Sequence, residues 1–289
     1  MIAGIKREGN VELADIITKS VKGAPVKFDD TKRVLIIDAD SIMYFATYFP
    51  EDSLIEFPTE IEQLEEAKYR TRTKLQEIQN NVEEWFNIQK TYIFVAGKNN
   101  FRYKVFPNYK INRAKTIKSP LLPIIKDYML EELEAIPSHG AEADDYVYDA
   151  MILSEGNCVV SSIDKDVFYN CPDVPYYNYR SYGEILGEFK NISKKESRLA
   201  IASQIVIGDS SDGVSGAYRV GQAWCKDNMH LDMTDYQFTK AVFQAYLKSN
   251  KGDFIEAKKQ IRLYYKILKL YTQKELNILD IDEHKENNN

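Results

Sequence analysis

Short apolar runs alternate with amphipathic stretches over the first two thirds of the chain. Residues 34–37 form a continuous apolar run that ends at Asp38 and predicts a buried parallel strand with a carboxylate at its C-terminal end. Further runs predict strands at 91–96, 158–162 and 174–179. Apolar residues at helical spacing predict helices at 60–88, 119–136 and 142–154. This alternation is typical of an α/β fold with a central, mostly parallel sheet flanked by helices.

The pattern becomes helical after about residue 185. Ser193 and Glu196 form one capping box, and Thr234 and Gln237 form another, so a helix is expected to begin at each. A third helix is expected over 253–272. The domain organisation that follows is an N-terminal extension over 1–30, an α/β core over 31–185, a helical region over 186–280 and a disordered tail over 281–289.

Carboxylates stand near the ends of the predicted strands. Asp38 follows the first strand, and Asp164 and Asp166 follow the third. The others lie at a helix start and in a loop: Glu142, Asp144, Asp145, Asp209 and Asp212. Sites in open α/β sheets form at the carboxyl ends of strands, so these groups are expected to converge on one crevice. Mutual repulsion is tolerated there only if cations neutralise it, and Mg²⁺ or Mn²⁺ ions take such oxygen ligands, many of them through water.

Each cluster also has an ordinary structural explanation. Acidic residues at a helix N-terminus interact favourably with the helix dipole, which accounts for residues 142–145. Asp and Gly are common turn residues, which accounts for 208–213. Asp38, at the end of an apolar run, is harder to explain without a partner, and the four clusters together favour a metal site.

The charge is unevenly distributed. The chain has 38 basic and 44 acidic residues, a net charge of −6, which argues mildly against a nucleic-acid partner. However, no Asp or Glu occurs from Trp85 to Lys126, and this stretch carries basic residues interleaved with Phe101, Tyr103, Phe106 and Tyr109. Basic groups bind phosphates and aromatic rings stack on unpaired bases, so the stretch is a candidate nucleic-acid surface. The alternative is a solvated basic loop with aromatic core anchors.

Other function classes fit poorly. Three cysteines without a CxxC pair argue against a disulfide framework or a thiolate zinc site, and the three histidines lack metal-ligand spacing. No Walker-type phosphate loop is present. No apolar run approaches the ~18 residues of a membrane span, and the first residues do not resemble a signal peptide. We therefore expect a cytoplasmic protein with no membrane partner.

The motifs resemble those of the structure-specific 5′-nucleases, which include flap endonucleases and phage 5′→3′ exonucleases. The matching segments are Ile37-Asp38, 140–145, 162–166 and 208–213, in the right order within about 33–225. The segment 107–120 looks most like the exonucleases of short-tailed phages. The resemblance implies a PIN-like nuclease core, a helical arch or clamp at about 97–136 and a C-terminal helix–three-turn–helix region.

The resemblance also implies roles for individual residues. The eight carboxylates would hold two or more Mg²⁺ or Mn²⁺ ions, and Lys110 and Arg113 would contact the scissile phosphate as catalytic groups. Tyr109 would stack on the terminal base, and Arg102 matches a second basic position. Lys115 and Lys118 would attract DNA without taking part in cleavage. The segment 213–221 would form the hairpin of the helix–three-turn–helix region, with Gly213, Gly216 and Gly221 as its glycines. This hairpin would bind duplex DNA through a K⁺ ion, or through Arg219 directly.

Three features depart from the family pattern. Arg219 stands where a Gly is frequent in the hairpin. Gly97 stands where relatives often have an acid, and Asp38-Ala39-Asp40 replaces a more usual Asp-Gly pair. The function implied is a metal-dependent 5′→3′ exonuclease or flap endonuclease acting as a monomer in phage DNA replication or recombination. Its substrates would be duplex DNA with a 5′ end, nick or flap, and RNA–DNA hybrids. The alternatives are a PIN-type single-strand ribonuclease and a non-catalytic nucleic-acid scaffold of the same fold.

Overall fold

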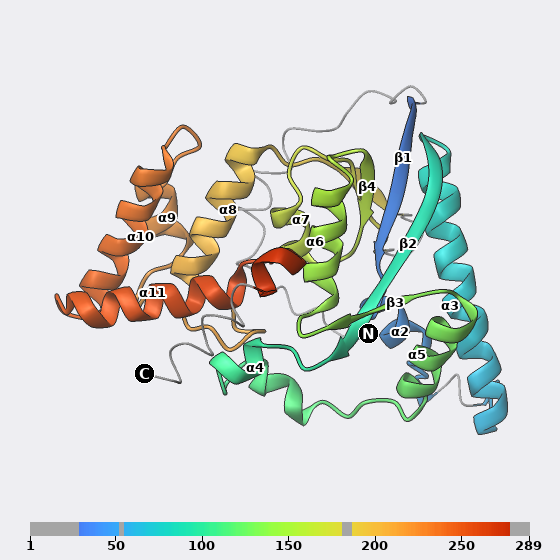
Figure 1. Cartoon of the computed structure of the whole chain (residues 1–289). Helices are drawn as coiled ribbons and strands as arrows, with labels where there is room; N and C mark the ends of the chain where they lie inside the picture. The colour runs from blue at the N-terminus through green and yellow to red at the C-terminus, as the bar shows by residue number, and fades with distance from the viewer. Residues whose placement is uncertain (1–28, 52–54, 181–186, 278–289) are drawn as a thin grey trace, which may run out of the picture.

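The computed structural model describes residues 29–51, 55–180 and 187–277. Six strands form one sheet in the order β3-β2-β1-β4-β5-β6 (Figure 1). They are β1 (Asp29–Asp38), β2 (Phe86–Lys98), β3 (Ile136–His139), β4 (Cys158–Ser161), β5 (Tyr176–Asn178) and β6 (Glu188–Lys190). The pairs are parallel except β5–β6, which is antiparallel. The predicted mostly parallel α/β sheet is confirmed.

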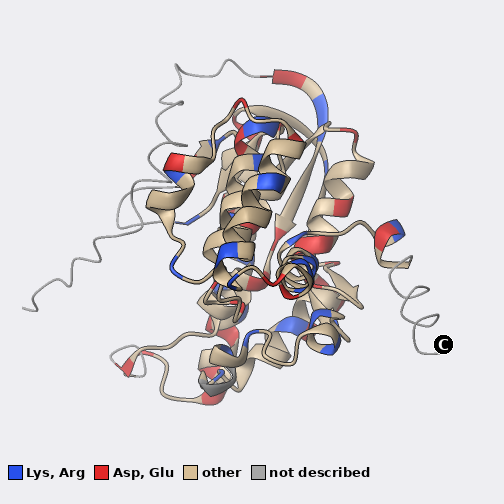
Figure 2. Cartoon of the chain, turned by 90° about the vertical axis from the view of Figure 1, so that its left-hand side faces the viewer, with Lys and Arg blue, Asp and Glu red and all other residues tan. Residues whose placement is uncertain are grey.

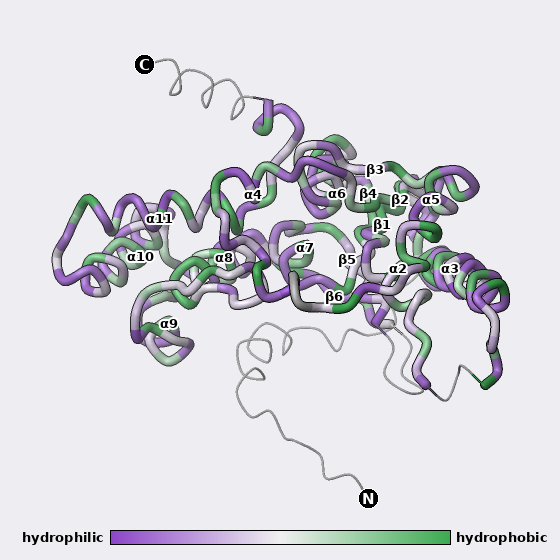
Figure 3. Tube along the Cα trace, turned by 90° about the horizontal axis from the view of Figure 1, so that it is seen from below, coloured by the Kyte–Doolittle hydropathy of each residue, from purple (hydrophilic) through white to green (hydrophobic). Residues whose placement is uncertain are grey.

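Helices cover both faces of this sheet, which explains the continuous apolar run in β1. Helices α2 (Asp40–Ala46), α3 (Glu60–Glu83) and α5 (Leu121–Glu132) lie on one side, where Leu35 and Ile37 pack. Helices α6 (Ala143–Leu153) and α7 (Lys165–Asn170) lie on the other, where Ile36 packs. Figure 3 shows the central strands between α3 and α5 on one side and α6 and α7 on the other. Successive β1 side chains are therefore buried on alternate faces.

The C-terminal region is a helical layer beside α6 and α7. It contains α8 (Lys194–Ile207), α9 (Gln222–Asn228), α10 (Asp235–Ser249) and α11 (Phe254–Leu268). Both predicted capping boxes are confirmed, at Ser193 with Glu196 and at Thr234 with Gln237. The buried Tyr246 of α10 donates to the carbonyl of Ile205 on α8 at 2.7 Å, which ties the two helices together.

Several boundaries differ from the prediction. The helix predicted to reach residue 88 ends at Glu83, and β2 begins already at Phe86. The helix predicted to reach 136 ends at Glu132, and β3 and β6 lie where no strand was expected. Both strands are short and lie at the edges of the sheet, and β3 contains Pro137, so neither has the apolar run of a central strand.

The part of the stretch 85–126 that follows β2, called the basic segment below, connects the sheet to the helical layer. It contains the short helix α4 (Arg102–Val105) and a 3₁₀ turn at Ile111–Lys115, so it does not form a continuous helical arch. In Figure 1 it runs along the lower edge of the molecule from α4 towards α5. Tyr109 is buried in the core of the helical layer, so the segment is fixed at that point. The tail at 281–289 that was predicted to be disordered, and all but the last two residues of the predicted extension at 1–30, lie outside the described residues.

Candidate functional site

The parallel pairing of β1 and β4 brings two carboxylate segments together. Ile37 of β1 lies opposite Ser161 of β4, so Asp38 and Ser162 leave the sheet side by side. The Ser162 hydroxyl donates to Asp38 Oδ2 at 2.7 Å. Asp164 then caps α7, and its Oδ1 accepts the backbone N–H of Asp166 at 2.7 Å. Asp38, Asp164 and Asp166 thus lie at one edge of the sheet, as predicted.

The start of α6 adds a third segment. Glu142 is the N-cap and Asp144 lies in the first turn. Burial raises the pKa of Asp144 well above its usual range, and repulsion from Asp38, Asp164 and Glu142 raises it further. Among the described residues, no side chain or backbone group donates a hydrogen bond or ion pair to the Asp144 carboxylate. The sequence therefore correctly places Asp144 beside Asp38 and Asp164.

The electrostatics of this crevice fit a divalent cation. Burial first, and then the neighbouring carboxylates, raise the pKa of Asp38 and of Asp166 to about 7. The pKa of Asp212 is raised to about 6, mainly by burial. As placed in the structure, no three His, Cys, Asp or Glu side chains of the described residues form a group that could hold a metal ion by themselves. An open set of carboxylate oxygens that lacks neutralising partners suits Mg²⁺, which keeps several waters.

Asp145 and Arg102 do not belong to this crevice, which corrects two predictions. The Arg102 guanidinium binds Asp145 through both terminal nitrogens, at 2.6 and 2.9 Å, and both side chains are at most 1% exposed. Arg102 also donates to the carbonyls of Ile267 and Lys269, while Asp145 accepts the N–H of Glu142 and of Tyr271. The pair joins α4 and α6 to the end of α11. Neither residue is free to hold a metal or contact DNA.

Lys110 lies at the acidic crevice. Its Nζ lies 2.5 Å from Glu142 Oε1 and 4.0 Å from Asp212 Oδ1. Burial alone would lower the pKa of Lys110, but Glu142 and Asp212 raise it, so the ammonium stays charged. The more exposed Arg113 has one guanidinium nitrogen 4.0 Å from Asp212 Oδ1. The structure therefore brings both predicted catalytic cations to the carboxylates.

Tyr109 occupies a different position from the one predicted. Its ring is only 2% exposed and packs edge-on against Tyr103, and its hydroxyl donates to Glu142 Oε2 at 2.6 Å. The ring is thus a core anchor and is not available to stack on a base. Lys118 is exposed, and Lys115 lies in the 3₁₀ turn. Figure 2 shows acidic positions gathered at the lower ends of the strands, with basic positions on neighbouring segments.

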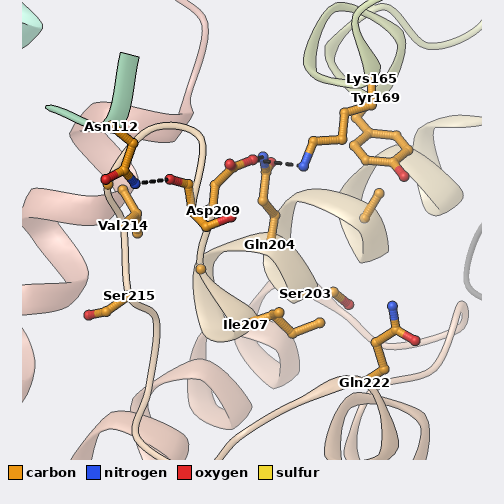
Figure 4. Close-up of a pocket in the computed structure, with 14 residues that line it drawn as sticks. Asn112, Lys165, Tyr169, Ser203, Gln204, Ile207, Asp209, Val214, Ser215 and Gln222 are labelled. Carbon is orange, nitrogen blue, oxygen red and sulfur yellow. Dashed lines mark hydrogen bonds and ion pairs between the residues drawn. The ribbon is translucent and has the colours of Figure 1, made fainter. Parts of the chain in front are cut away.

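The turn after α8 brings Asp209 and Asp212 to the same region. Gly208 ends α8 with a φ of 89°, and Asp209 pairs with Val214 in an isolated bridge. Asp209 Oδ2 accepts from Lys165 Nζ at 2.7 Å and from Gln204 Nε2 at 3.1 Å (Figure 4). Gln204 Nε2 also donates to Asp166 Oδ1 at 2.7 Å. Burial would raise the pKa of Asp209, but these hydrogen bonds and those from Ser211 lower it to about 2.

Sequence reasoning assigned no role to Asp40, Lys165 or Gln204. Asp40 Oδ1 accepts the N–H of Ala96 at 2.7 Å, which fixes the end of β2 beside β1. The position of Asp40, two residues after Asp38, could have indicated that it lies near the site. No neighbouring residue in the sequence indicates a role for Gln204. At Gly97 a Cβ atom would come within 1.4 Å of the Ser138 carbonyl oxygen, so no acid fits on this backbone.

The predicted hairpin residues form a compact turn. Gly213 and Gly216 have φ values of 78° and 69°, and a Cβ on Gly213 would lie 2.5 Å from the carbonyl of Asn108 in the basic segment. Arg219 is exposed, and its guanidinium lies over the Tyr218 ring at 5.1 Å. Gly221 is the exposed N-cap residue of α9. These exposed groups lie on the surface, where phosphates can reach them.

Comparison with solved structures identifies the fold. The catalytic core of Rad2 in complex with a DNA substrate matches with a TM-score of 0.50 and 14% identity, over 90% of this chain and 79% of that one. The bacteriophage T5 D15 flap endonuclease, in a pseudo-enzyme-product complex with DNA and metal ions, matches with a TM-score of 0.47 and 15% identity. That match covers 82% of this chain and 99% of the other. The sequence matches no family model. In the ranges that the structure describes, no helix is long and apolar enough to cross a membrane.

Proposed function

We propose that the protein is a metal-dependent, structure-specific 5′-nuclease that hydrolyses phosphodiester bonds in DNA. The observation that carries this proposal is the meeting of carboxylates from four separate segments with Lys110 and Arg113 at the carboxyl ends of the strands. The fold shared with the catalytic core of Rad2, which was solved with a DNA substrate, supports it.

Asp38, Asp144, Asp164 and Asp166 are the proposed metal-holding residues, with Mg²⁺ or Mn²⁺ as the metal. When bound, such an ion lowers the pKa of water and stabilises negative charge on the reacting phosphate. The raised pKa values of Asp38 and Asp166 support this assignment, because burial and repulsion from neighbouring carboxylates disfavour their charged forms, which a bound cation would stabilise. The side chain of Asp144, free of hydrogen bonds within the described part of the chain, is the most available ligand.

The chain supplies the remaining electrostatics. Lys110 and Arg113 stand beside the carboxylates, where they stabilise charge that builds on the phosphoryl oxygens. Exposed Lys118 and Arg219 supply contacts to the DNA backbone outside the reacting centre. Because such contacts read charge and not base sequence, we propose low sequence specificity.

The motif resemblance supports a more specific proposal for the activity, the substrates and the biological role. We propose 5′→3′ exonuclease and flap-cleaving activity on duplex DNA and RNA–DNA hybrids, by a monomer, in phage replication or recombination. A PIN-type ribonuclease accounts less well for the long basic segment and for the glycine hairpin of 208–221. A non-catalytic scaffold accounts less well for the costly group of buried carboxylates.

Digestion of 5′-labelled substrates tests the proposal. Linear duplex, nicked duplex, 5′-flap and RNA–DNA hybrid substrates are incubated with Mg²⁺, Mn²⁺ or EDTA. We expect short labelled products from the flap and nicked substrates with either metal and none with EDTA. Cleavage of single-stranded RNA alone would favour the PIN-type alternative. DNA binding without cleavage under every metal condition would favour the scaffold.

A further inference from the structure

Lys165 occupies an unusual place in the acidic crevice. It stands between Asp164 and Asp166 in sequence and opens α7, and its Nζ lies 2.7 Å from Asp209 Oδ2. The Asp209 side chain is 3% exposed, whereas that of Lys165 is 54% exposed. The lysine therefore reaches from the surface to a buried carboxylate, as Figure 4 shows.

Both oxygens of Asp209 are already satisfied by the protein. Oδ1 accepts the backbone N–H and the hydroxyl of Ser211, at 2.8 and 2.6 Å. Oδ2 accepts Lys165 and the amide of Gln204. A carboxylate with four such donors has little capacity left for a metal ion.

Gln204 extends this arrangement to Asp166. Its amide nitrogen donates to carboxylates of both Asp166 and Asp209, so the side chain cannot be rotated by 180° without setting oxygen against oxygen. Its Oε1 atom is buried and has no partner among the described residues. This unsatisfied acceptor is the cost of holding the nitrogen toward both carboxylates. The Gln204 amide thus orders the carboxylates of Asp166 and Asp209, and Lys165 neutralises Asp209.

On the other side of the crevice, the carboxylates lack basic partners among the described residues. No ammonium or guanidinium contacts Asp38 or Asp144 within the described residues, and the donors to Asp38 are a serine hydroxyl and a backbone N–H. The Asp144 carboxylate accepts no hydrogen bond from any described residue. The need for an external cation is thus concentrated at Asp38 and Asp144, and the Asp164 carboxylate lies close to both.

We propose that Lys165 supplies at Asp209 the positive charge that a second divalent ion would bring, so that the chain binds one divalent ion, at Asp38, Asp144 and Asp164. This inference rests on the proposed function and refines it, because the motif resemblance implies two or more ions. An ammonium group has three donor hydrogens, and Asp209 takes one of them. Lys165 also lines a cavity of about 750 Å³ together with Asn112, Ser203 and Gln222.

The test is the number of Mn²⁺ ions bound by the full-length protein without DNA, measured by electron paramagnetic resonance of the free ion. We expect one bound ion in the wild type. Lys165→Ala frees Asp209 and should bind a second ion at least about tenfold more tightly than the wild type does, the scale on which outer-shell partners alter metal affinity. Lys165→Arg keeps the charge and should bind one ion. Lys195→Ala, which removes a lysine paired with the exposed Asp232, is the matched control and should also bind one.

The outcomes separate the inference from the proposed function. Two ions of similar affinity in the wild type would overturn the inference and leave the nuclease proposal intact. One ion in folded Lys165→Ala, with no second site, would also overturn it. Absence of binding in every variant would overturn both. Circular dichroism verifies the fold, and Lys165→Met provides a second charge-removing variant if the alanine variant is unstable.

Discussion

Lys110 and Lys118 are both lysines of the basic segment, but the structure gives them different environments. Lys110 lies against Glu142 and close to Asp212, whereas Lys118 is exposed. We predict that Lys110→Ala lowers the single-turnover cleavage rate at saturating enzyme by roughly 100-fold, because it removes a fixed charge where negative charge develops. Lys118→Ala should weaken binding and leave the saturated rate nearly unchanged. Equal effects of the two substitutions would make Lys110 a general DNA contact.

The Arg102–Asp145 pair is a structural element of the fold. Replacing Arg102 with Met leaves Asp145 buried without its cation, so we predict a loss of about 3–5 kcal/mol in the free energy of unfolding. Urea denaturation measures it. Arg102→Met combined with Asp145→Leu should recover part of the loss, since no buried charge then remains. If Arg102 were a DNA contact instead, Arg102→Met would change DNA affinity and leave the denaturation midpoint unchanged.

The sequence predicts the position of Asp144 correctly and that of Asp145 wrongly, for one geometric reason. Adjacent residues of a helix point about 100° apart. At the start of α6 one carboxylate therefore faces the crevice and the next faces α4 and α11. The sequence shows two neighbouring acids without showing which faces the site. Lys165 was missed because its partner Asp209 lies on another segment, and Gln204 because its partner Asp166 does.

At the scale of elements, the turn after α8 depends on glycines with positive φ. A Cβ on Gly216 would lie 2.3 Å from the carbonyl carbon of Ile207, and its φ is 69°. We predict that Gly216→Ala destabilises the fold by about 2 kcal/mol or more and displaces Asp209 and Asp212. Thermal denaturation gives the first effect and cleavage rate the second. Gly221→Ala is the matched control: a Cβ at Gly221 would meet no atom within 4 Å, so stability should be unchanged.

Central elements were easier to predict than edge elements. The apolar runs of β1 and β4 are buried on both faces, which makes the pattern unambiguous. The edge strands β3 and β6 have four and three residues, too few to show a period. The basic segment lacks a period because its aromatic residues pack individually, as Tyr109 does against Tyr103 and Phe101 against Tyr271.

At the scale of the whole molecule, the acidic crevice makes stability depend on pH and metal. The pKa of Asp38 and of Asp166 is about 7 in the fold, against an ordinary value near 3.9. Between these values the folded state binds more protons than the unfolded state, so stability falls as pH rises from about 4 to 7. The pKa of Asp209, lowered to about 2, has the opposite effect, but the stability it contributes is lost only below about pH 4.

We therefore predict that the protein in EDTA loses at least about 1.4 kcal/mol of stability between pH 5 and pH 7.5, the equivalent of one pKa unit. Added Mg²⁺ or Mn²⁺ should restore stability at pH 7.5, because the ion binds only the folded crevice. Asp38→Asn should reduce the pH dependence and stabilise the metal-free protein at pH 7.5. Denaturant titration at both pH values measures these effects. A free energy of unfolding that rises with pH in EDTA would contradict this prediction, because it would show that the fold itself stabilises the charged carboxylates.

The central claim is that carboxylates at the strand ends form a metal-dependent cleavage centre, and Asp144→Asn tests it most directly. This substitution keeps the shape of a side chain that forms no hydrogen bond to any described residue, so it removes a ligand charge and little else. The measurement is the single-turnover cleavage rate of a 5′-flap substrate in Mg²⁺, with Asp149→Asn on the same helix as the control. We predict a loss of roughly 100-fold or more for Asp144→Asn, with DNA affinity unchanged or tighter, and a wild-type rate for Asp149→Asn. A wild-type rate for folded Asp144→Asn would contradict the account.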